Sequence, residues 1–100
     1  MKEFISIPIE SEQAVLGAII SNPKTIPFFI ENIKAKDFSN KQHKMIYKAI
    51  QYLFFQGVGV DLVLIAETLK ASGKLQECGG ALYLAELVTP WLTEVERALD

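Results

Sequence analysis

Cysteine is almost absent from this sequence, and the motifs of several catalytic classes are missing altogether. Cys78 is the only cysteine, so no internal disulfide can form, as is typical of proteins kept in a reducing cytoplasm. Neither GxxxxGK[ST] nor GxGxxG occurs, which argues against nucleotide hydrolysis by this chain. His43 is the only histidine and has no cysteine partner at metal-ligand spacing, which argues against a zinc site. We therefore expect no catalytic residue, cofactor or metal in this chain.

Long hydrophobic runs and a strong charge of one sign are missing as well. The longest stretch without a charged residue, Ala49 to Val60, is too short to span a bilayer. The start of the sequence, MKEFISIPIE, lacks the apolar core of a secretory signal because Pro8 interrupts it. A net charge of -2 predicts no general attraction to nucleic acid or to anionic membranes. These features predict a soluble, cytoplasmic protein without a membrane partner.

What the sequence does contain is helical periodicity in a chain of one-domain length. Half of its 100 residues are apolar and 22% are charged, as in ordinary globular domains. No segment alternates strictly between apolar and polar residues, so no half-buried strand is expected. We predict an all-α bundle with a flexible arm at residues 1–9 and helices at 10–21, 26–33, 39–57, 62–72 and 80–88.

The central helix of this prediction runs from Ser39 to Gly57, with Ser39 as the N-cap and Gly57 as the terminating residue. Its apolar face is broad enough to need several neighbouring helices, and it comprises Ile46, Ile50, Leu53 and Phe54, widened by Met45, Ala49 and Tyr52.

The other helix ends are predicted from the same signals. Thr25 is expected to cap the second helix, whose buried side would be Phe28, Phe29 and Ile33. Asp61 is expected to cap the fourth helix and Gly73 to end it. The fifth helix, with Leu82, Leu84, Ala85 and Leu87 largely buried, is expected to stop at Thr89-Pro90, and Thr93 would cap a further helix in the tail.

Two residues stand out within these helices. Gly17 lowers the helix propensity of the first helix, so it is expected to permit the close approach of another helix. His43 lies on the apolar face of the central helix, where a structural histidine bonded to a backbone carbonyl is favoured over a partner contact. The glutamates are scattered, so we expect them on solvated faces.

The lysines are concentrated in one part of the chain. Lys34, Lys36, Lys41, Lys44 and Lys48 fall in a stretch whose only acid is Asp37. Lys41, Lys44 and Lys48 share one side of the central helix, where they would meet phosphates or an acidic partner. A solvated face is favoured, because no arginine or suitably placed aromatic residue accompanies them. A nucleic-acid-binding helical module remains the alternative function.

Two pairs of adjacent aromatic residues, Phe28/Phe29 and Phe54/Phe55, leave a second question open. Neighbouring residues on a helix point about 100° apart, so both members of a pair are buried only when the helix is covered on two sides. A protein–protein surface and a wide core explain these pairs equally well.

Four short patterns in this order resemble one known family. They are Glu10-Ser11-Glu12-Gln13-Ala14-Val15-Leu16-Gly17; Asp37-Phe38 with His43 and Ile46-Tyr47; Asp61 with Leu69 and Gly73; and Gly79-Gly80 with Tyr83-Leu84-Ala85-Glu86-Leu87. Together, from about Glu10 to Val88, they resemble the amino-terminal domain of the DnaB-type replicative DNA helicase.

The resemblance implies a compact orthogonal bundle of about five to six helices over residues 10–90, without catalytic residues. In the family this domain is followed by a helical hairpin, a linker and a RecA-like ATPase, which uses ATP and Mg²⁺. The hairpins pair the domains into a collar on a homohexameric ring, which binds DNA, docks the DnaG-type primase and influences loading. The implied partners are therefore other helicase subunits, primase and a helicase loader, with DNA contacted through the parent.

The resemblance also assigns roles to individual residues. Gly17, His43, Tyr83 and Glu86 match as structural residues, beside the capping residues Asp61 and Gly73. Independently of the resemblance, the candidate interface residues are the aromatic side chains Phe28, Phe29, Phe55 and Trp91. Pro8 lies closer to the glutamate pair than the family's proline does, so the arm is expected to follow a different course. Residues 91–100 reach only the start of the hairpin or linker, so the chain is expected to be a domain fragment without the ATPase.

Overall fold

A computed structural model describes residues 8–99, and describes side chains as far as residue 91. This part of the chain forms five α-helices and three single 3₁₀ turns, and it contains no strand. The helices are α1 (Ile9–Ser21), α2 (Ile26–Asn32), α3 (Lys41–Phe55), α4 (Leu62–Ala71) and α5 (Gly80–Leu99). The all-α prediction is confirmed. The expected arm at residues 1–9 lies almost wholly outside the described residues.

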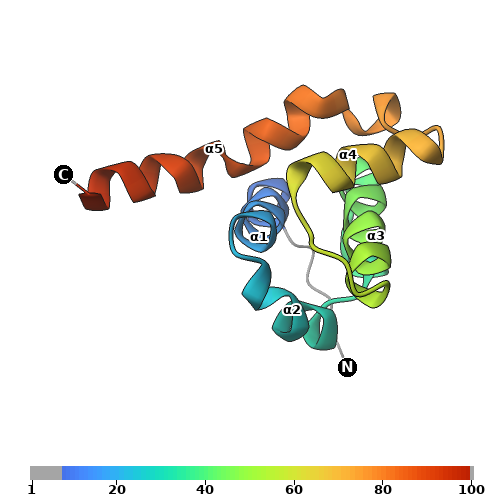
Figure 1. The fold of residues 1–100 in the computed structure, drawn as a ribbon, viewed down its shortest axis with the longest axis horizontal. Helices are drawn as coiled ribbons and strands as arrows, with labels where there is room; N and C mark the ends of the chain where they lie inside the picture. Colours follow the sequence, from blue (N-terminus) through green and yellow to red (C-terminus); the bar gives the residue numbers. More distant parts are fainter. Residues whose placement is uncertain (1–7, 100) are drawn as a thin grey trace.

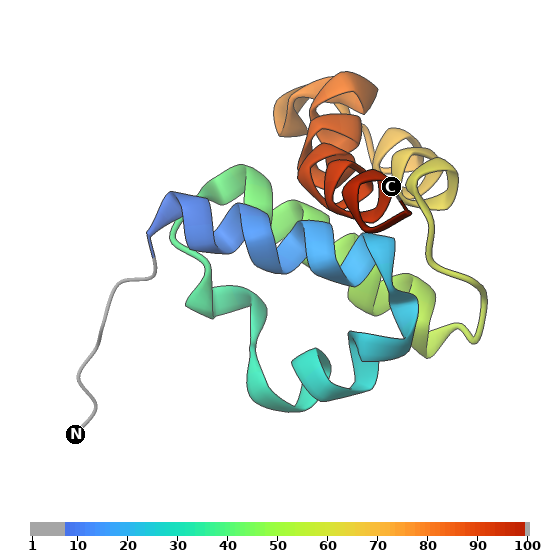
Figure 2. The ribbon, with the colours of Figure 1, turned by 90° about the vertical axis from the view of Figure 1, so that its left-hand side faces the viewer.

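The helices cross steeply around one core. In Figure 1, α1 is seen nearly end-on while α5 runs across the picture, and in Figure 2 this relation is reversed. α1 packs most extensively against α5, and α3 packs against both α4 and α1. α5 continues beyond this globule toward the left of Figure 1, which helps to give the molecule extents of 45 × 33 × 25 Å.

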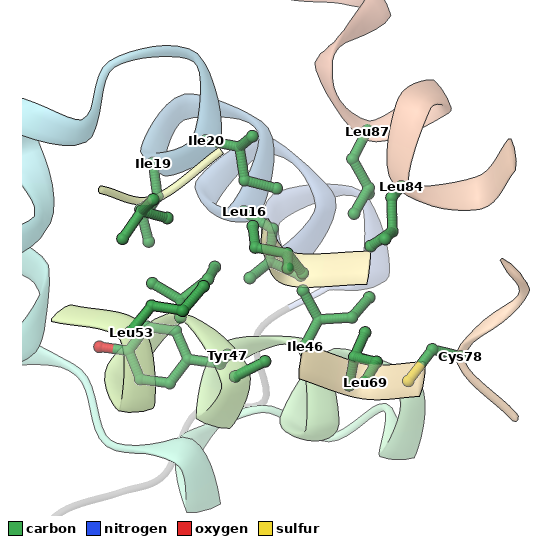
Figure 3. Close-up of a cluster of buried hydrophobic side chains, with 14 of the residues drawn as sticks. Leu16, Ile19, Ile20, Ile46, Tyr47, Leu53, Leu69, Cys78, Leu84 and Leu87 are labelled. Carbon is green, nitrogen blue, oxygen red and sulfur yellow. The ribbon is translucent and has the colours of Figure 1, made fainter. Parts of the chain in front are cut away.

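The core is one continuous apolar cluster to which all five described helices and the turn at Cys78 contribute. Figure 3 shows side chains of these elements meeting in one place: Leu16, Ile19 and Ile20 from α1; Ile46, Tyr47 and Leu53 from α3; Leu69 from α4; and Leu84 and Leu87 from α5. Each fully buried Leu or Ile side chain contributes about 1.5–3 kcal/mol of hydrophobic free energy. The predicted need of α3 for several neighbours is therefore confirmed.

Tyr47 was not predicted as a core residue, yet its side chain is fully buried at the join of α2 and α3. Its hydroxyl lies 2.7 Å from the carbonyl oxygen of Ile33 and 3.1 Å from that of Phe29, and it donates to this pair. Burial and the nearby negative charge of Asp37 raise the pKa of Tyr47, so the hydroxyl keeps its proton. Tyr52, which was predicted to widen the buried face, is 56% exposed instead.

Several predicted helix ends need correction. The N-cap of α3 is Asn40, whose side chain accepts from His43 N at 3.0 Å, because Ser39 is engaged elsewhere. Thr25 makes no capping bond to α2, since its hydroxyl donates to Asn22 O. The predicted roles of Asp61 and Gly73 are confirmed: Asp61 accepts from Leu64 N at 2.8 Å, and Gly73 follows α4 with φ 74°.

The largest error concerns α5, which continues through Pro90 to Leu99 instead of ending at Thr89. A proline inside a helix removes one backbone hydrogen bond and clashes with the preceding turn, at about 3 kcal/mol. Packing against α1 on both sides of Pro90, at Leu87 and at Trp91, offsets this cost. The separate tail helix capped by Thr93 is therefore absent. Leu82, expected in the core, is 73% exposed.

Candidate functional site

The polar centre of the molecule is a buried cluster of Glu12, His43 and Tyr83, which joins α1, α3 and α5. Glu12 and His43 are fully buried. His43 Nδ1 lies 2.7 Å from Glu12 Oε1, and His43 Nε2 lies 2.7 Å from the hydroxyl of Tyr83. Three helices distant in sequence therefore meet at one imidazole ring.

Glu12 holds the start of α3 as well as the histidine. Its Oε2 accepts from Ser39 N at 2.6 Å and from Ser39 Oγ at 2.9 Å, and its Oε1 accepts from Asn40 N at 3.4 Å. Because these amides precede the N-terminus of α3, the positive end of the helix dipole also favours a carboxylate there. Glu12 is thus an extra cap for α3, supplied by α1.

These hydrogen bonds set the protonation of the cluster. Burial raises the pKa of Glu12, but the bonds from His43, Ser39 and Asn40 outweigh burial and leave the pKa below its ordinary value. A carboxylate only accepts, so His43 Nδ1 carries a proton. With a neutral ring, Nε2 accepts from Tyr83, whose oxygen accepts from Gln13 Nε2 at 3.1 Å. Every donor then has an acceptor.

The hydrogen bonds of the cluster link α1, α3 and α5. Within the described residues, every buried polar side-chain atom has a hydrogen-bond partner. No group of three histidine, cysteine or acidic side chains in residues 8–91 is placed to hold a metal ion. The expectation that His43 bonds a backbone carbonyl is wrong, and so is the expectation that Glu12 is solvated. Sequence periodicity placed both residues on helix faces but gave no sign of their contact.

Gly17 lies where α1 and α5 approach most closely. A Cβ atom at this position would overlap the carbonyl oxygen of Leu87 and come within 2.6 Å of Trp91 Nε1. The close helix approach that the sequence predicts therefore depends on the missing side chain. Trp91, one of the candidate interface residues, lies across this contact and is 37% exposed.

Glu86 does not join the polar cluster. It is exposed on α5, where it lines a pocket of about 460 Å³ between α1 and α5 together with Glu10, Gln13 and Trp91. Both charged residues of this pocket are acids, so its rim is negative.

The candidate interface phenylalanines divide into exposed and half-buried members. Phe28 is 64% exposed and Phe55 is 68% exposed, whereas Phe29 is half-buried against the core. Phe28 packs edge-on to Phe29, with ring centroids 5.4 Å apart. The prediction that Phe28 belongs to the buried side of α2 is therefore wrong. It leaves a large aromatic ring in solvent, as interface residues often are.

The three candidate contact lysines lie along α3. Lys41 and Lys48 are exposed and Lys44 is half-buried. Lys48 borders a groove of about 750 Å³ between α3 and α4, and Lys41 borders a smaller depression that shares Met45 with this groove. The sequence predicted the lysine-bearing side of the helix but not the groove beside it.

No described helix is long and apolar enough to cross a membrane.

Cys78 is fully buried in the turn before α5. Burial raises the pKa of its thiol, and the negative charge of Glu77 raises it further. Cys78 therefore packs as a small apolar side chain.

The sequence and the fold both match known proteins. The family described as the DnaB-like helicase N-terminal domain matches residues 6–98. The replicative DNA helicase DnaB of Rhodothermus marinus is 42% identical over 81 residues, which are 81% of this chain and 9% of that protein. The replicative DNA helicase DnaB of Geobacillus stearothermophilus is 40% identical over 79 residues, which are 79% of this chain and 17% of that protein.

A solved structure gives the same result in three dimensions. The crystal structure of the N-terminal domain of DnaB helicase from Mycobacterium tuberculosis superposes with a TM-score of 0.81 at 32% identity. The match covers 84% of this chain and 61% of that one. The chain thus spans less than a fifth of each of the two full-length relatives and about three fifths of the solved domain.

Proposed function

Because this chain belongs to the family of DnaB-like helicase N-terminal domains, we propose that it is the non-catalytic part of a cytoplasmic replicative helicase. Its work is to help assemble the helicase subunits into a ring and to dock primase or a loader during DNA replication. Binding and hydrolysis of ATP with Mg²⁺ belong to the remainder of the parent protein, which also carries the contact with DNA. The observation that carries the proposal is the match of family, sequence and fold over most of the chain.

The described structure supports a mechanical role. The cluster of Glu12, His43 and Tyr83 ties three helices together and is fully satisfied internally, so it offers no reactive group to a substrate. Several large apolar side chains remain in solvent instead, Phe28 and Phe55 among them. A rigid scaffold with exposed aromatic residues is suited to binding other proteins.

The experiment uses the full-length parent protein, with and without residues 1–100. Native mass spectrometry should show a hexamer for the intact protein and smaller species for the truncated one. Pull-down with the cognate primase should succeed only with the intact protein. A truncated protein that still forms hexamers and retains primase would overturn the proposal.

The aromatic surface of α2 is tested separately in the intact protein. Phe28→Ala should weaken primase binding about five-fold or more, because truncating an aromatic interface anchor commonly has at least this effect. Leu82→Ala is the control, since this apolar side chain is also largely exposed but lies on α5 and belongs to no candidate interface. Equal primase binding by both variants would remove the assignment to Phe28 and leave the rest of the proposal intact.

A further inference from the structure

The groove between α3 and α4 is built from two matching rows of side chains. α3 contributes Met45, Lys48, Ala49 and Tyr52, and α4 contributes Leu64, Glu67, Thr68 and Ala71. Each row follows the i, i+3, i+4, i+7 spacing that places residues along one helix face. The two helices cross steeply in Figure 1, so the two rows meet at an angle around a groove of about 750 Å³.

This groove is mainly apolar, and the described residues leave it open. Leu69 lies at its base and is almost fully buried, whereas Tyr52 on its wall is 56% exposed. An amphipathic helix that lies along one of these rows fills an apolar groove with its own i, i+3, i+4 and i+7 side chains. The shape therefore suits a third helix.

The charges beside the groove indicate the character of that helix. Lys48 and Lys74 line it, and neither ammonium group is paired with a carboxylate within residues 8–91. Glu67 is the single acid among its lining residues. Lys41 and Lys44 extend the positive side of α3 beyond the groove. The surroundings thus favour an occupant with carboxylates flanking its apolar face.

Two other occupants fit less well. A second copy of this chain docking by the same groove around a two-fold axis would bring its lysines toward those of the first copy. The chain's own α5 ends at the left of Figure 1, whereas α4 ends at the right, so α5 does not extend over the groove.

We infer that the groove between α3 and α4 docks an acidic amphipathic helix of a partner protein. The apolar side of this helix fills the space between Met45, Tyr52 and Leu64, and its carboxylates face Lys48 and Lys74. The inference rests on the proposed docking function, for which it supplies a place and a class of partner chemistry.

The probe is a displayed library of 16-residue peptides selected against the 100-residue chain, followed by titration of the synthesised winners. The recovered peptides should carry apolar residues at helical spacing and more acids than bases. Tyr52→Ala should weaken their binding about five-fold or more. The double variant Lys48→Glu and Lys74→Glu should weaken binding by a similar factor and reduce its dependence on salt.

Matched variants keep the result interpretable. Leu82→Ala removes an exposed apolar side chain outside the groove, and Lys24→Glu reverses an exposed charge elsewhere. Both should bind the selected peptides as the unchanged chain does, and thermal melting of every variant verifies the fold. Recovery of no peptides or of basic ones, or equal binding by Tyr52→Ala, would overturn the inference.

The same lysine variants also test whether the groove binds nucleic acid instead. If a thymidine 20-mer binds the chain, with affinity lost on reversal of Lys48 and Lys74, while no acidic peptide is recovered, the groove belongs to a DNA-contacting face and the inference fails. If the parent protein binds primase but no peptide binds the groove, the proposed function stands and only the inference about the groove fails.

Discussion

Two helix–helix contacts in this molecule differ in how closely they pack. The contact between α1 and α5 is closed by Gly17 and ends in the buried cluster of Glu12, His43 and Tyr83. The contact between α3 and α4 opens on its outer side into the apolar groove bordered by lysines. The surface pocket of the first contact has an acidic rim, whereas unpaired lysines line the groove of the second.

The difference shows how a small domain divides stability from binding. Buried polar groups that are fully satisfied fix the relative positions of three helices, and a missing side chain lets two of them touch. At the α3–α4 groove, Lys48 and Lys74 have no carboxylate partner within residues 8–91 and remain available to another molecule. Substitutions should therefore affect stability at the first contact and association at the second.

The largest expected effect is at Glu12. Glu12→Ala leaves the buried Nδ1 proton of His43 and the amide of Ser39 without their acceptor. Leaving these buried donors without an acceptor should lower the free energy of unfolding by about 3 kcal/mol, measured by urea denaturation. The control is Glu10→Ala on the exposed side of the same helix, with an expected change within about 0.5 kcal/mol.

Acid titration supplies a second readout for Glu12. Its pKa is lower in the folded chain than in the unfolded one, so its contribution is complete above the ordinary value of 4.5 and is lost as pH falls through the folded-state value. The unchanged chain should lose more stability below pH 4.5 than Glu12→Ala does. Parallel pH profiles for the two proteins would show that Glu12 does not hold this cluster together.

A smaller effect is expected at Gly17. Gly17→Ala places a methyl group against the backbone of Leu87 and the ring of Trp91, so α5 must shift away from α1. Such overpacking should lower the free energy of unfolding by about 2 kcal/mol. Gly59→Ala is the control, because no atom lies within 4 Å of its added Cβ and its φ is outside the left-handed region. A stability gain of about 0.5 kcal/mol is expected there.

The sequence predicted the features that depend on local chemistry. The caps at Asp61 and Gly73 follow from residues acting on their own helix. The close approach at Gly17 was predicted from the missing side chain, but its partner, the distant helix α5, was not. Family resemblance added Tyr83 as a structural residue, although periodicity alone gave it no partner.

What the sequence did not predict depends on contacts between distant segments. Glu12 looked like a solvated acid because its partners lie 27 to 31 positions away. Ser39 was taken as the cap of α3, but that same glutamate engages it and leaves the capping role to Asn40. At Pro90 the local rule for ending a helix was correct in isolation, yet packing of α5 against α1 overrode it.

The final comparison uses two tyrosines, one at each contact. Tyr83→Phe removes the hydroxyl that lies between Gln13 and His43, so the free energy of unfolding should fall by about 1 kcal/mol. Tyr52→Phe removes an exposed hydroxyl from the groove and should change stability by less than about 0.5 kcal/mol. Denaturant unfolding of the two variants and of the double variant gives both values.

Variants at the same two tyrosines also distinguish effects on folding stability from effects on peptide binding. Tyr83→Phe should bind groove-selected peptides unchanged, because its hydroxyl faces the buried cluster and does not line the groove. Tyr52→Ala should lose that binding while its melting temperature stays close to that of the unchanged chain. If each variant lost both properties together, the two contacts would form a single coupled unit. The α3–α4 groove would then be part of what holds the domain folded, because only shared packing transmits a loss from one contact to the other.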